Sequence, residues 1–302
     1  MVRLSPTWEN NLKMLKKYQK ILCCPDDGAN VTLEGNHLEC PRCGRRFSII
    51  NNNFIEMLPP TFPEWRLSKD NKGNLKTEEG YKDIFDKEFR WYEKPGGWGD
   101  LSAANPGYRA FVKSEVERIY EFISPYDEKI LADISGGVGN YSIPLSESLK
   151  AVFHCELDVE SIQTAYHRGK EKNMFFIRTP YLKLPFDSDV FDYVVCTDTL
   201  LRGRAHELML LTEIKRILKN GGRAIVDFHN QRPFYRDRFI RLYNRKEIAS
   251  LLLDADIKQY EIYPFGYVPS VFVPSEFFYS AMNRIFSFFV PCQRYIVVFS
   301  KI

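Results

Sequence analysis

Short apolar runs alternate with amphipathic, helix-compatible stretches over residues 108–302 of the chain. Two of these runs, at residues 130–134 and 151–155, predict buried strands. The first run ends in a glycine cluster at residues 136–139, after which the sequence can start a helix, and the second run ends on Glu156. Strand, glycine turn, helix and strand in this order predict a doubly wound α/β domain with a parallel sheet.

The glycine turn and the acid together indicate a site for a nucleoside. Glycine lets the backbone approach a ligand closely, and the start of a helix offers unpaired amide groups. An acid at the end of the second strand is placed to hold a ribose diol. The turn lacks the third spaced glycine of a pyrophosphate-binding loop, and no lysine follows it. A nucleoside without phosphate groups therefore fits better than a dinucleotide or a nucleoside triphosphate.

Four motifs extend this pattern along the chain. They are residues 133–139, Glu156, residues 184–192 (LPFDSDVFD) and residues 218–222 (LKNGG). With these motifs in the same order, the region from about residue 108 to 302 resembles the class I S-adenosylmethionine-dependent methyltransferases. The resemblance implies a Rossmann-like doubly wound sheet of seven strands, the last antiparallel, and S-adenosyl-L-methionine as the methyl donor. It assigns the cofactor to Asp133, Ser135, Gly136, Gly137, Gly139, Glu156, Leu157, Tyr181 and Thr197.

Two positions depart from the family pattern. Ser135 replaces the first glycine of the turn, and serine is tolerated there if its φ angle stays negative. Pro180 stands where an acid usually contacts the adenine amino group. We therefore expect backbone atoms near residues 179–182 to contact the adenine, with Tyr181 beside it.

Methyl transfer asks little of protein side chains, because the sulfonium donor is already activated and alignment supplies most of the acceleration. A base is needed only when the acceptor must lose a proton. Asp198 and His229 are the candidates, because they follow the predicted fourth and fifth strands, where the acceptor should approach. The alternatives are that Asp198 caps the next helix and that His229 only makes hydrogen bonds within its loop.

Four of the seven cysteines lie close together near the N-terminus. Two matching turns, CPDDG from Cys24 and CPRCG from Cys40, predict a zinc site with Cys24, Asp27, Cys40 and Cys43 as ligands. Residues 21–57 resemble the zinc-ribbon modules that precede some methyltransferase domains or serve others as activator subunits. Because Asp27 replaces the usual second cysteine, two alternatives stay open. The site borrows Cys23 or His37, or the ribbon has lost its metal.

Composition and segment boundaries complete the prediction. The charged fraction of 27% and hydrophobic fraction of 44% are those of an ordinary globular protein, and the net charge is only +3. The sequence contains no long apolar segment and no secretory signal, so we expect a cytoplasmic protein. We predict an N-terminal helix and zinc-ribbon-like module at residues 1–58 and a linker and lid at 59–107. The methyltransferase domain would follow at 108–302, with an acceptor-side insertion at about 264–291.

Three functions are compatible with these features. The first is methylation of a small molecule, favoured by the near-neutral charge and by the aromatic insertion. The second is methylation of RNA, as in ribosomal-RNA guanine methyltransferases that join a zinc ribbon to this fold; alternating arginines and aromatics in residues 232–246, interpreted as a helix, favour it. The third is a non-catalytic cofactor-binding or scaffolding role. The sequence leaves the oligomeric state open.

Overall fold

The structure is a computed structural model that describes residues 15–50, 54–58, 105–170, 172–181, 183–233, 240–268 and 275–302. Residues 59–104, most of the predicted linker and lid, lie outside these ranges. None of the helices within them combines the length and apolarity that a membrane span requires.

The described elements fall into a small N-terminal group and a larger α/β group. The N-terminal group contains η1 (Gln19–Ile21), β1 (Thr32–Glu34), β2 (His37–Glu39), β3 (Arg46–Ile50) and β4 (Phe54–Glu56). The first half of the α/β group contains α3 (Pro106–Phe122), β5 (Ile130–Ile134), α4 (Ser142–Leu145), β6 (Ala151–Glu156), α5 (Val159–Gly169), β7 (Met174–Arg178) and β8 (Phe191–Cys196). The second half contains α6 (Arg204–Ile217), β9 (Leu218–His229), α7 (Arg245–Asp254), β10 (Tyr260–Phe265), α8 (Glu276–Phe286) and β11 (Arg294–Ser300).

The α/β group contains the doubly wound sheet that the sequence predicts. Its strands lie in the order β7-β6-β5-β8-β9-β11-β10. Strands β5 to β9 pair in parallel, whereas the last strand, β11, runs antiparallel between β9 and β10. The chain reverses its strand order between β5 and β8, and in open α/β sheets ligands bind beside such a switch point, outside the carboxyl ends of the strands.

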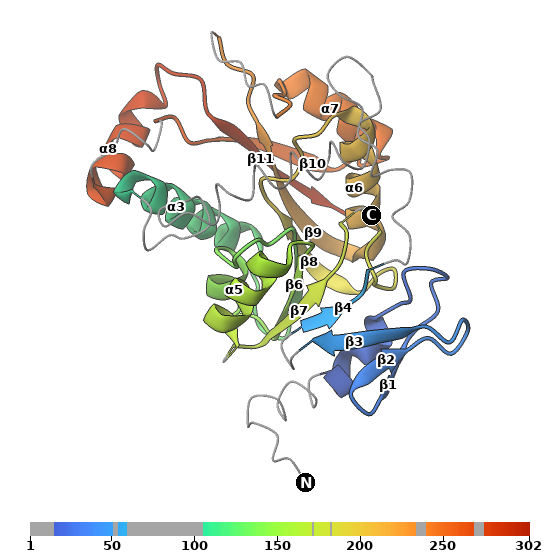
Figure 1. Cartoon of the computed structure of the whole chain (residues 1–302). Helices are drawn as coiled ribbons and strands as arrows, with labels where there is room; N and C mark the ends of the chain where they lie inside the picture. The colour runs from blue at the N-terminus through green and yellow to red at the C-terminus, as the bar shows by residue number, and fades with distance from the viewer. Residues whose placement is uncertain are drawn as a thin grey trace.

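Helices cover both faces of this sheet, as Figure 1 shows. Alternate residues of β5 belong to different cores, because successive strand side chains point to opposite faces. Ala132 packs in the core that includes α6 and α7, and Leu131 packs in the core that includes α3 and α5. All five residues of β5 are buried. The site-forming strand ends are therefore supported from both sides.

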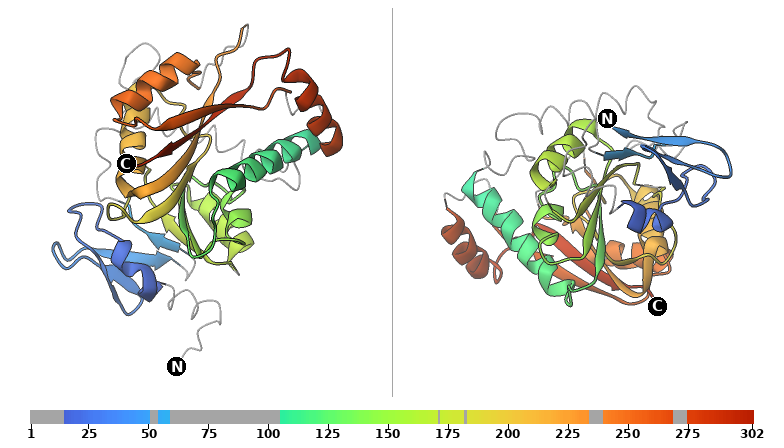
Figure 2. Two further views of the ribbon diagram at one scale, coloured as in Figure 1. Left: turned by 180° about the vertical axis from the view of Figure 1, so that it is seen from behind. Right: turned by 90° about the horizontal axis from the view of Figure 1, so that it is seen from below.

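The N-terminal strands extend the same sheet, so that it has eleven strands among the described residues. Strand β4 pairs in parallel with β7, with Ile55 opposite Ile177 and Glu56 opposite Arg178. The Met57 amide also donates to the Arg178 carbonyl oxygen at 2.9 Å. The extra strands lengthen the predicted seven-stranded sheet without changing its central order. Figure 2 shows the N-terminal group and α8 at opposite sides of the molecule.

Two local expectations differ from the structure. The helix expected after the glycine cluster is only the four-residue α4, which is followed by turns up to Lys150. Pro144 lies within it and has no amide hydrogen to continue a helical ladder. The helix expected over residues 232–246 is also wrong for the part of this segment that the structure describes. Arg241 and Leu242 lie outside any helix, and α7 begins only at Arg245, after the Asn244 cap.

The packing of the N-terminal group on the sheet generates a stability prediction. The Tyr18 ring makes edge contacts with Phe153 and Phe175, with ring centroids 5.5 and 5.3 Å apart, and its buried hydroxyl has no hydrogen-bond partner among the described residues. We expect Tyr18→Ala to lower the free energy of unfolding by about 3 kcal/mol. Tyr18→Phe, the matched control, keeps the ring and removes an unsatisfied hydroxyl, so it should leave stability equal or higher. Urea denaturation measures both, and equal losses would contradict the packing described.

Candidate active site

The turn after β5 has the sharp backbone that the glycine cluster predicts. Gly137 and Gly139 have φ angles of 55° and 83°, in the left-handed region. Ser135 also lies there, with φ of 57°, so the condition of a negative φ, under which serine is tolerated at this position, is not met. A left-handed serine carries a modest steric cost, and such strain is often found at ligand sites.

Gly136 lies against side chains that leave no room for a Cβ atom. A Cβ there would be 2.5 Å from the Cε1 and Nδ1 atoms of His154 and 2.7 Å from the Asp133 Oδ2 atom. His154 is itself fixed, because its Nε2 atom is 3.0 Å from the Gly137 carbonyl oxygen and its Nδ1 atom is 2.8 Å from the Ser142 hydroxyl. The turn therefore packs directly against a buried histidine, and only glycine fits at position 136.

Two buried carboxylates flank this turn. Glu156, at the end of β6, accepts hydrogen bonds from the amides of Gly137 (2.8 Å), Leu157 (2.7 Å) and Asp158 (2.9 Å). Burial raises the pKa of Glu156, and these amides oppose the rise. Asp133 is 1% exposed, and neither of its carboxylate oxygens has a hydrogen-bond partner among the described residues. The Nδ1 atom of His154 is 3.9 Å from the Asp133 Oδ2 atom, which is too far for a hydrogen bond. A buried carboxylate that lacks a hydrogen-bond partner is chemically suited to a ligand with a cationic group.

The remaining predicted cofactor residues lie at the same edge of the sheet. Leu157 follows β6, and Tyr181 comes shortly after β7. The Tyr181 hydroxyl is 3.0 Å from the Nε2 atom of His206, so the tyrosine has a partner in the protein. Thr197 is buried directly after β8, and its carbonyl oxygen accepts a hydrogen bond from the Thr199 hydroxyl at 2.9 Å.

The two predicted catalytic residues are in contact. The Nε2 atom of His229, at the end of β9, is 2.8 Å from the Oδ1 atom of Asp198, which follows β8. The His229 side chain is 22% exposed and that of Asp198 is 36% exposed. Gly203 is the N-cap residue of α6, so the helix-capping alternative for Asp198 does not hold. Asp198 has a φ of 54°, which is a strained conformation for this residue.

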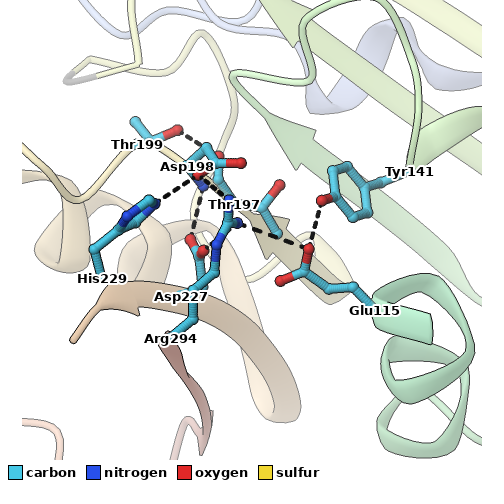
Figure 3. A network of polar contacts seen from close by, with 8 residues as sticks. All are labelled: Glu115, Tyr141, Thr197, Asp198, Thr199, Asp227, His229 and Arg294. Carbon is cyan, nitrogen blue, oxygen red and sulfur yellow. Dashed lines mark hydrogen bonds and ion pairs between the residues drawn. The ribbon is translucent and has the colours of Figure 1, made fainter. Parts of the chain in front are cut away.

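A buried arginine joins this pair to further acids (Figure 3). Arg294, the first residue of β11, is 6% exposed and contacts Asp198 Oδ1 and Asp227 Oδ2, each at 2.8 Å. Glu115 of α3 lies 3.7 Å from the same guanidinium and accepts a hydrogen bond from the Tyr141 hydroxyl at 2.5 Å. Tyr141 follows the glycine turn, so the network connects the turn with the His229 side of the site.

The three acids of this network titrate differently. Burial would raise the pKa of Asp198, but the positive charge of Arg294 and the contact with His229 outweigh it and hold this pKa well below its usual range. Burial raises the pKa of Asp227, against the opposing effect of Arg294. Burial also raises the pKa of Glu115 to about 8. Asp198 is therefore ionised at neutral pH, while Glu115 holds a proton.

Asp198, Asp227 and His229 each offer one ligand atom, and these three atoms lie within 4.8 Å of one another. This spacing is compatible with a bound metal ion. However, Arg294 donates to both carboxylates. Its guanidinium supplies the positive charge at this place, so the group needs no cation from outside.

The predicted metal ligands of the N-terminal group also lie together. Ligand atoms of Cys24, Asp27, Cys40 and Cys43 are all within 4.8 Å of one another. The sulfur atoms of Cys24 and Cys43 are 3.8 Å apart, and the Cys40 sulfur is 3.5 Å from each Asp27 carboxylate oxygen. Two thiolates bound to one tetrahedral zinc at about 2.3 Å would be separated by about 3.8 Å. The donor set and its spacing therefore fit zinc.

The other possible ligands of that site have different contacts. The sulfur of Cys23 is 3.5 Å from the Asn30 amide nitrogen, and His37 lies 3.3 Å from Glu39. Neither belongs to the group of four described above. Both turns have a glycine in the left-handed region at their fifth position, Gly28 and Gly44, with φ of 73° and 70°. The turn with Asp27 thus copies the geometry of the turn with Cys43.

Sequence reasoning missed four members of the network, Arg294, Asp227, Glu115 and Tyr141. Glu115 carries a signal, because it lies on the apolar stripe of α3 formed by Phe111, Val112, Val116 and Ile119. A charged residue at the start of an otherwise apolar strand is a weaker signal for Arg294. Their contacts with one another depend on the tertiary fold.

Comparison with known proteins agrees with this geometry. Residues 132–226 match the family model described as a methyltransferase domain. No curated protein sequence matches the chain. Residues 132–226 therefore belong to a methyltransferase domain.

Solved structures share the fold at low sequence identity. A possible histamine N-methyltransferase from Thermotoga maritima has 17% identity and a TM-score of 0.51, over 74% of this chain and 98% of the other. The magnesium protoporphyrin IX methyltransferase of Synechocystis, with bound S-adenosylhomocysteine, has 15% identity and a TM-score of 0.50, over 73% and 94%. A phosphoethanolamine N-methyltransferase from Haemonchus contortus has 15% identity and a TM-score of 0.53, over 75% and 50%.

The raised pKa of Glu115 generates a pH prediction. Between its ordinary pKa of 4.5 and about 8, the folded state binds a proton that the unfolded state has lost, so Glu115 makes stability fall as pH rises through this window. Glu115→Gln cannot ionise, and its amide oxygen can still accept the Tyr141 hydrogen bond. We expect this variant to gain stability over the wild type progressively as pH rises through that window. Urea denaturation across the same range tests it, with the exposed Glu117→Gln as the control. Parallel curves for wild type and Glu115→Gln would contradict the buried, protonated state.

Proposed function

We propose that this protein transfers the methyl group of S-adenosylmethionine to a small molecule whose acceptor atom carries a proton, with His229 as the base. The observation that carries the proposal is the 2.8 Å contact between His229 and Asp198 at the carboxyl edge of β8 and β9, the same edge as the glycine turn. A base is required when the acceptor is protonated, as a hydroxyl is at neutral pH.

The residues around the turn support the choice of cofactor. In this proposal Glu156 holds the ribose, and its Oε2 atom, with one amide donor, keeps a lone pair for a hydroxyl. The orphaned carboxylate of Asp133 suits the cationic ammonium of the methionine part. Gly137, which has open space at its Cβ position, lets this part approach the backbone, while Leu157, Tyr181 and Thr197 border the adenine side. When bound, S-adenosylmethionine supplies an activated methyl group on a sulfonium centre.

Proton removal follows from the orientation of the imidazole. Because Asp198 is ionised, the Nε2 atom of His229 is the donor in their hydrogen bond, which leaves the lone pair on Nδ1. We assign to Nδ1 the role of accepting the proton of the substrate. Asp198 keeps the ring in this tautomer and stabilises the imidazolium that forms, as the carboxylate does in other acid–histidine pairs.

The charges near the base favour a small molecule over RNA. Three carboxyl groups, those of Glu115, Asp198 and Asp227, surround a single arginine, and Arg294 is already paired with them. Binding of an RNA backbone relies on cations that meet phosphates, so an acid-rich acceptor region is unfavourable for it. Part of the arginine-rich segment, residues 234–239, lies outside the described ranges.

We also propose that Cys24, Asp27, Cys40 and Cys43 hold a structural zinc ion. The ligand spacing described above supports this set over the alternatives with Cys23 or His37. Four protein ligands leave no open coordination position, as is usual for structural zinc. The ion would fix the two turns that precede β1 and β3.

Elemental analysis of the protein purified without chelators tests the zinc proposal. We expect about one zinc per chain in the wild type and in Asp27→Cys, because the latter restores the commoner ligand set. Cys40→Ser should lose most of the metal, whereas Cys155→Ser, a buried cysteine of β6, should keep it. A metal-free wild type, or a Cys40→Ser variant with full zinc content, would refute this ligand set.

Calorimetry with S-adenosylhomocysteine tests cofactor binding. The wild type should bind, and Gly136→Ala should weaken binding about tenfold or more, because its Cβ would overlap His154 and Asp133. Gly221→Ala is the control, because its φ of 77° gives the substitution a backbone cost without any Cβ overlap and away from the glycine turn. The absence of binding to the wild type would favour a non-catalytic role.

A labelled methyl donor then identifies the acceptor class. Cell extract separated into small molecules, RNA and protein is incubated with tritiated S-adenosylmethionine and the enzyme. We expect label to appear in the small-molecule fraction with the wild type, to be lost with Gly136→Ala, and to fall strongly with His229→Asn. Label retained in RNA would establish the RNA alternative in place of the proposed substrate class.

A further inference from the structure

We propose that Arg294 is a positioning residue for the proposed base, His229. Arg294 fixes the Asp198 carboxylate, and this carboxylate keeps the proton of His229 on Nε2 and the lone pair on Nδ1. The inference rests on the proposed function for its catalytic meaning. Its structural content, the control of the His229 tautomer by Arg294, can be tested without knowing the methyl acceptor.

The shared oxygen atom is the first observation. Asp198 Oδ1 contacts both the Nε2 atom of His229 and the Nη2 atom of Arg294, each at 2.8 Å. Two donors on one oxygen fix the position of the carboxylate more firmly than one donor does. Since Arg294 cannot accept a hydrogen bond and Asp198 is ionised, the oxygen is the acceptor in both contacts, which makes Nε2 of His229 the protonated nitrogen.

Asp227 gives the arrangement its rigidity. One carboxylate oxygen of Asp227 accepts from Arg294 at 2.8 Å, and the other accepts from the Asp198 backbone amide at 2.7 Å. The side chain and the backbone of Asp198 are thus both tied to the Arg294–Asp227 pair. This double attachment offsets the strain of the left-handed backbone of Asp198, whose φ is 54°.

The guanidinium is fixed in turn by α3. It lies over the ring of Phe111, with 4.8 Å between its central carbon and the ring centroid, and Glu115 approaches to 3.7 Å. Planar stacking and a forked donor pattern are properties of arginine that lysine lacks. Arg294 therefore acts as the point where α3, β8, β9 and β11 meet.

Charge balance gives the arrangement a catalytic consequence. Glu115 is protonated, Asp198 is ionised, and one oxygen of the Asp198 carboxylate contacts both His229 and Arg294. Transfer of the acceptor proton to His229 therefore places the positive charge of the imidazolium 2.8 Å from this carboxylate. The network is therefore preorganised for the imidazolium form, which develops as the proton leaves the substrate. Without Arg294, neighbouring Asp198 and Asp227 could not both remain ionised at low cost.

Nitrogen-15 NMR of the imidazole side chains tests the proposal directly. We expect neutral His229 in the wild type to show one tautomer, protonated at Nε2, with His229→Asn used to assign its signals. Arg294→Gln should give averaged signals from both tautomers, and Arg294→Lys should fall between the two. Arg223→Gln removes an exposed arginine from the middle of β9, six residues before His229, so this matched charge change should leave the tautomer as in the wild type.

A second variant covers the case in which Arg294→Gln does not fold. The double variant Asp227→Asn with Arg294→Gln removes a buried carboxylate charge together with its cationic partner. The amide oxygen that Asp227→Asn introduces can still accept the hydrogen bond of the Asp198 backbone amide. The His229 signals should again be averaged over both tautomers. A single Nε2-protonated tautomer in a folded variant that lacks Arg294 would overturn the proposal.

Activity separates this inference from the proposed function. Arg294→Gln should lower the rate of methyl transfer about tenfold or more, while the Kd for S-adenosylhomocysteine stays within about threefold of the wild type. If His229→Asn transfers methyl groups at the wild-type rate, the proposed base is wrong, yet the tautomer measurement still reports on Arg294. Unchanged transfer in Arg294→Gln alone would contradict the positioning role.

Discussion

The parallel pairing of β5 with β6 on one side and β8 on the other is the constraint on which the rest of the site depends. It brings the carboxyl ends of these strands to one edge, so that the glycine turn, Glu156 and Asp198 lie together although they are far apart in sequence. Because β5 is buried on both faces, its register is strongly specified, and a slip of one residue would exchange the two cores. The geometry of both halves of the site is therefore set by the sheet and its two covering layers.

The polar network shows how this fold accommodates buried charge. A lone arginine in a strand would be costly to bury, and each neighbouring carboxylate would be costly as well. Ion pairs and hydrogen bonds among these groups compensate for most of this desolvation cost. Glu115 avoids the cost of a buried charge by staying protonated. The result is a set of acids with distinct charge states, produced by one cation and by unequal burial. Such separation is a common property of sites that move protons.

Much of the fold and half of the site could be predicted from the sequence. The turn at Gly136 and the acid Glu156 are local signals, because glycine and a strand-ending carboxylate report on the backbone and on the ligand within a short segment. The candidates Asp198 and His229 could be named from strand ends, but not their contact. Arg294 was missed because its role depends on residues from three distant elements. The left-handed φ of Ser135 could not be predicted, because residue type alone favours a negative φ for serine.

The pairing of β4 with β7 has a consequence for the integrity of the domain. An uncovered parallel strand with apolar neighbours is a template for association with other chains, and β4 occupies that position on β7. Since the covering strand belongs to the same polypeptide, its effective concentration does not fall when the protein is diluted. A fragment starting at α3 would have to recruit an equivalent strand from solution, and its solubility would suffer. The N-terminal strands thus make the methyltransferase sheet self-sufficient at its β7 edge.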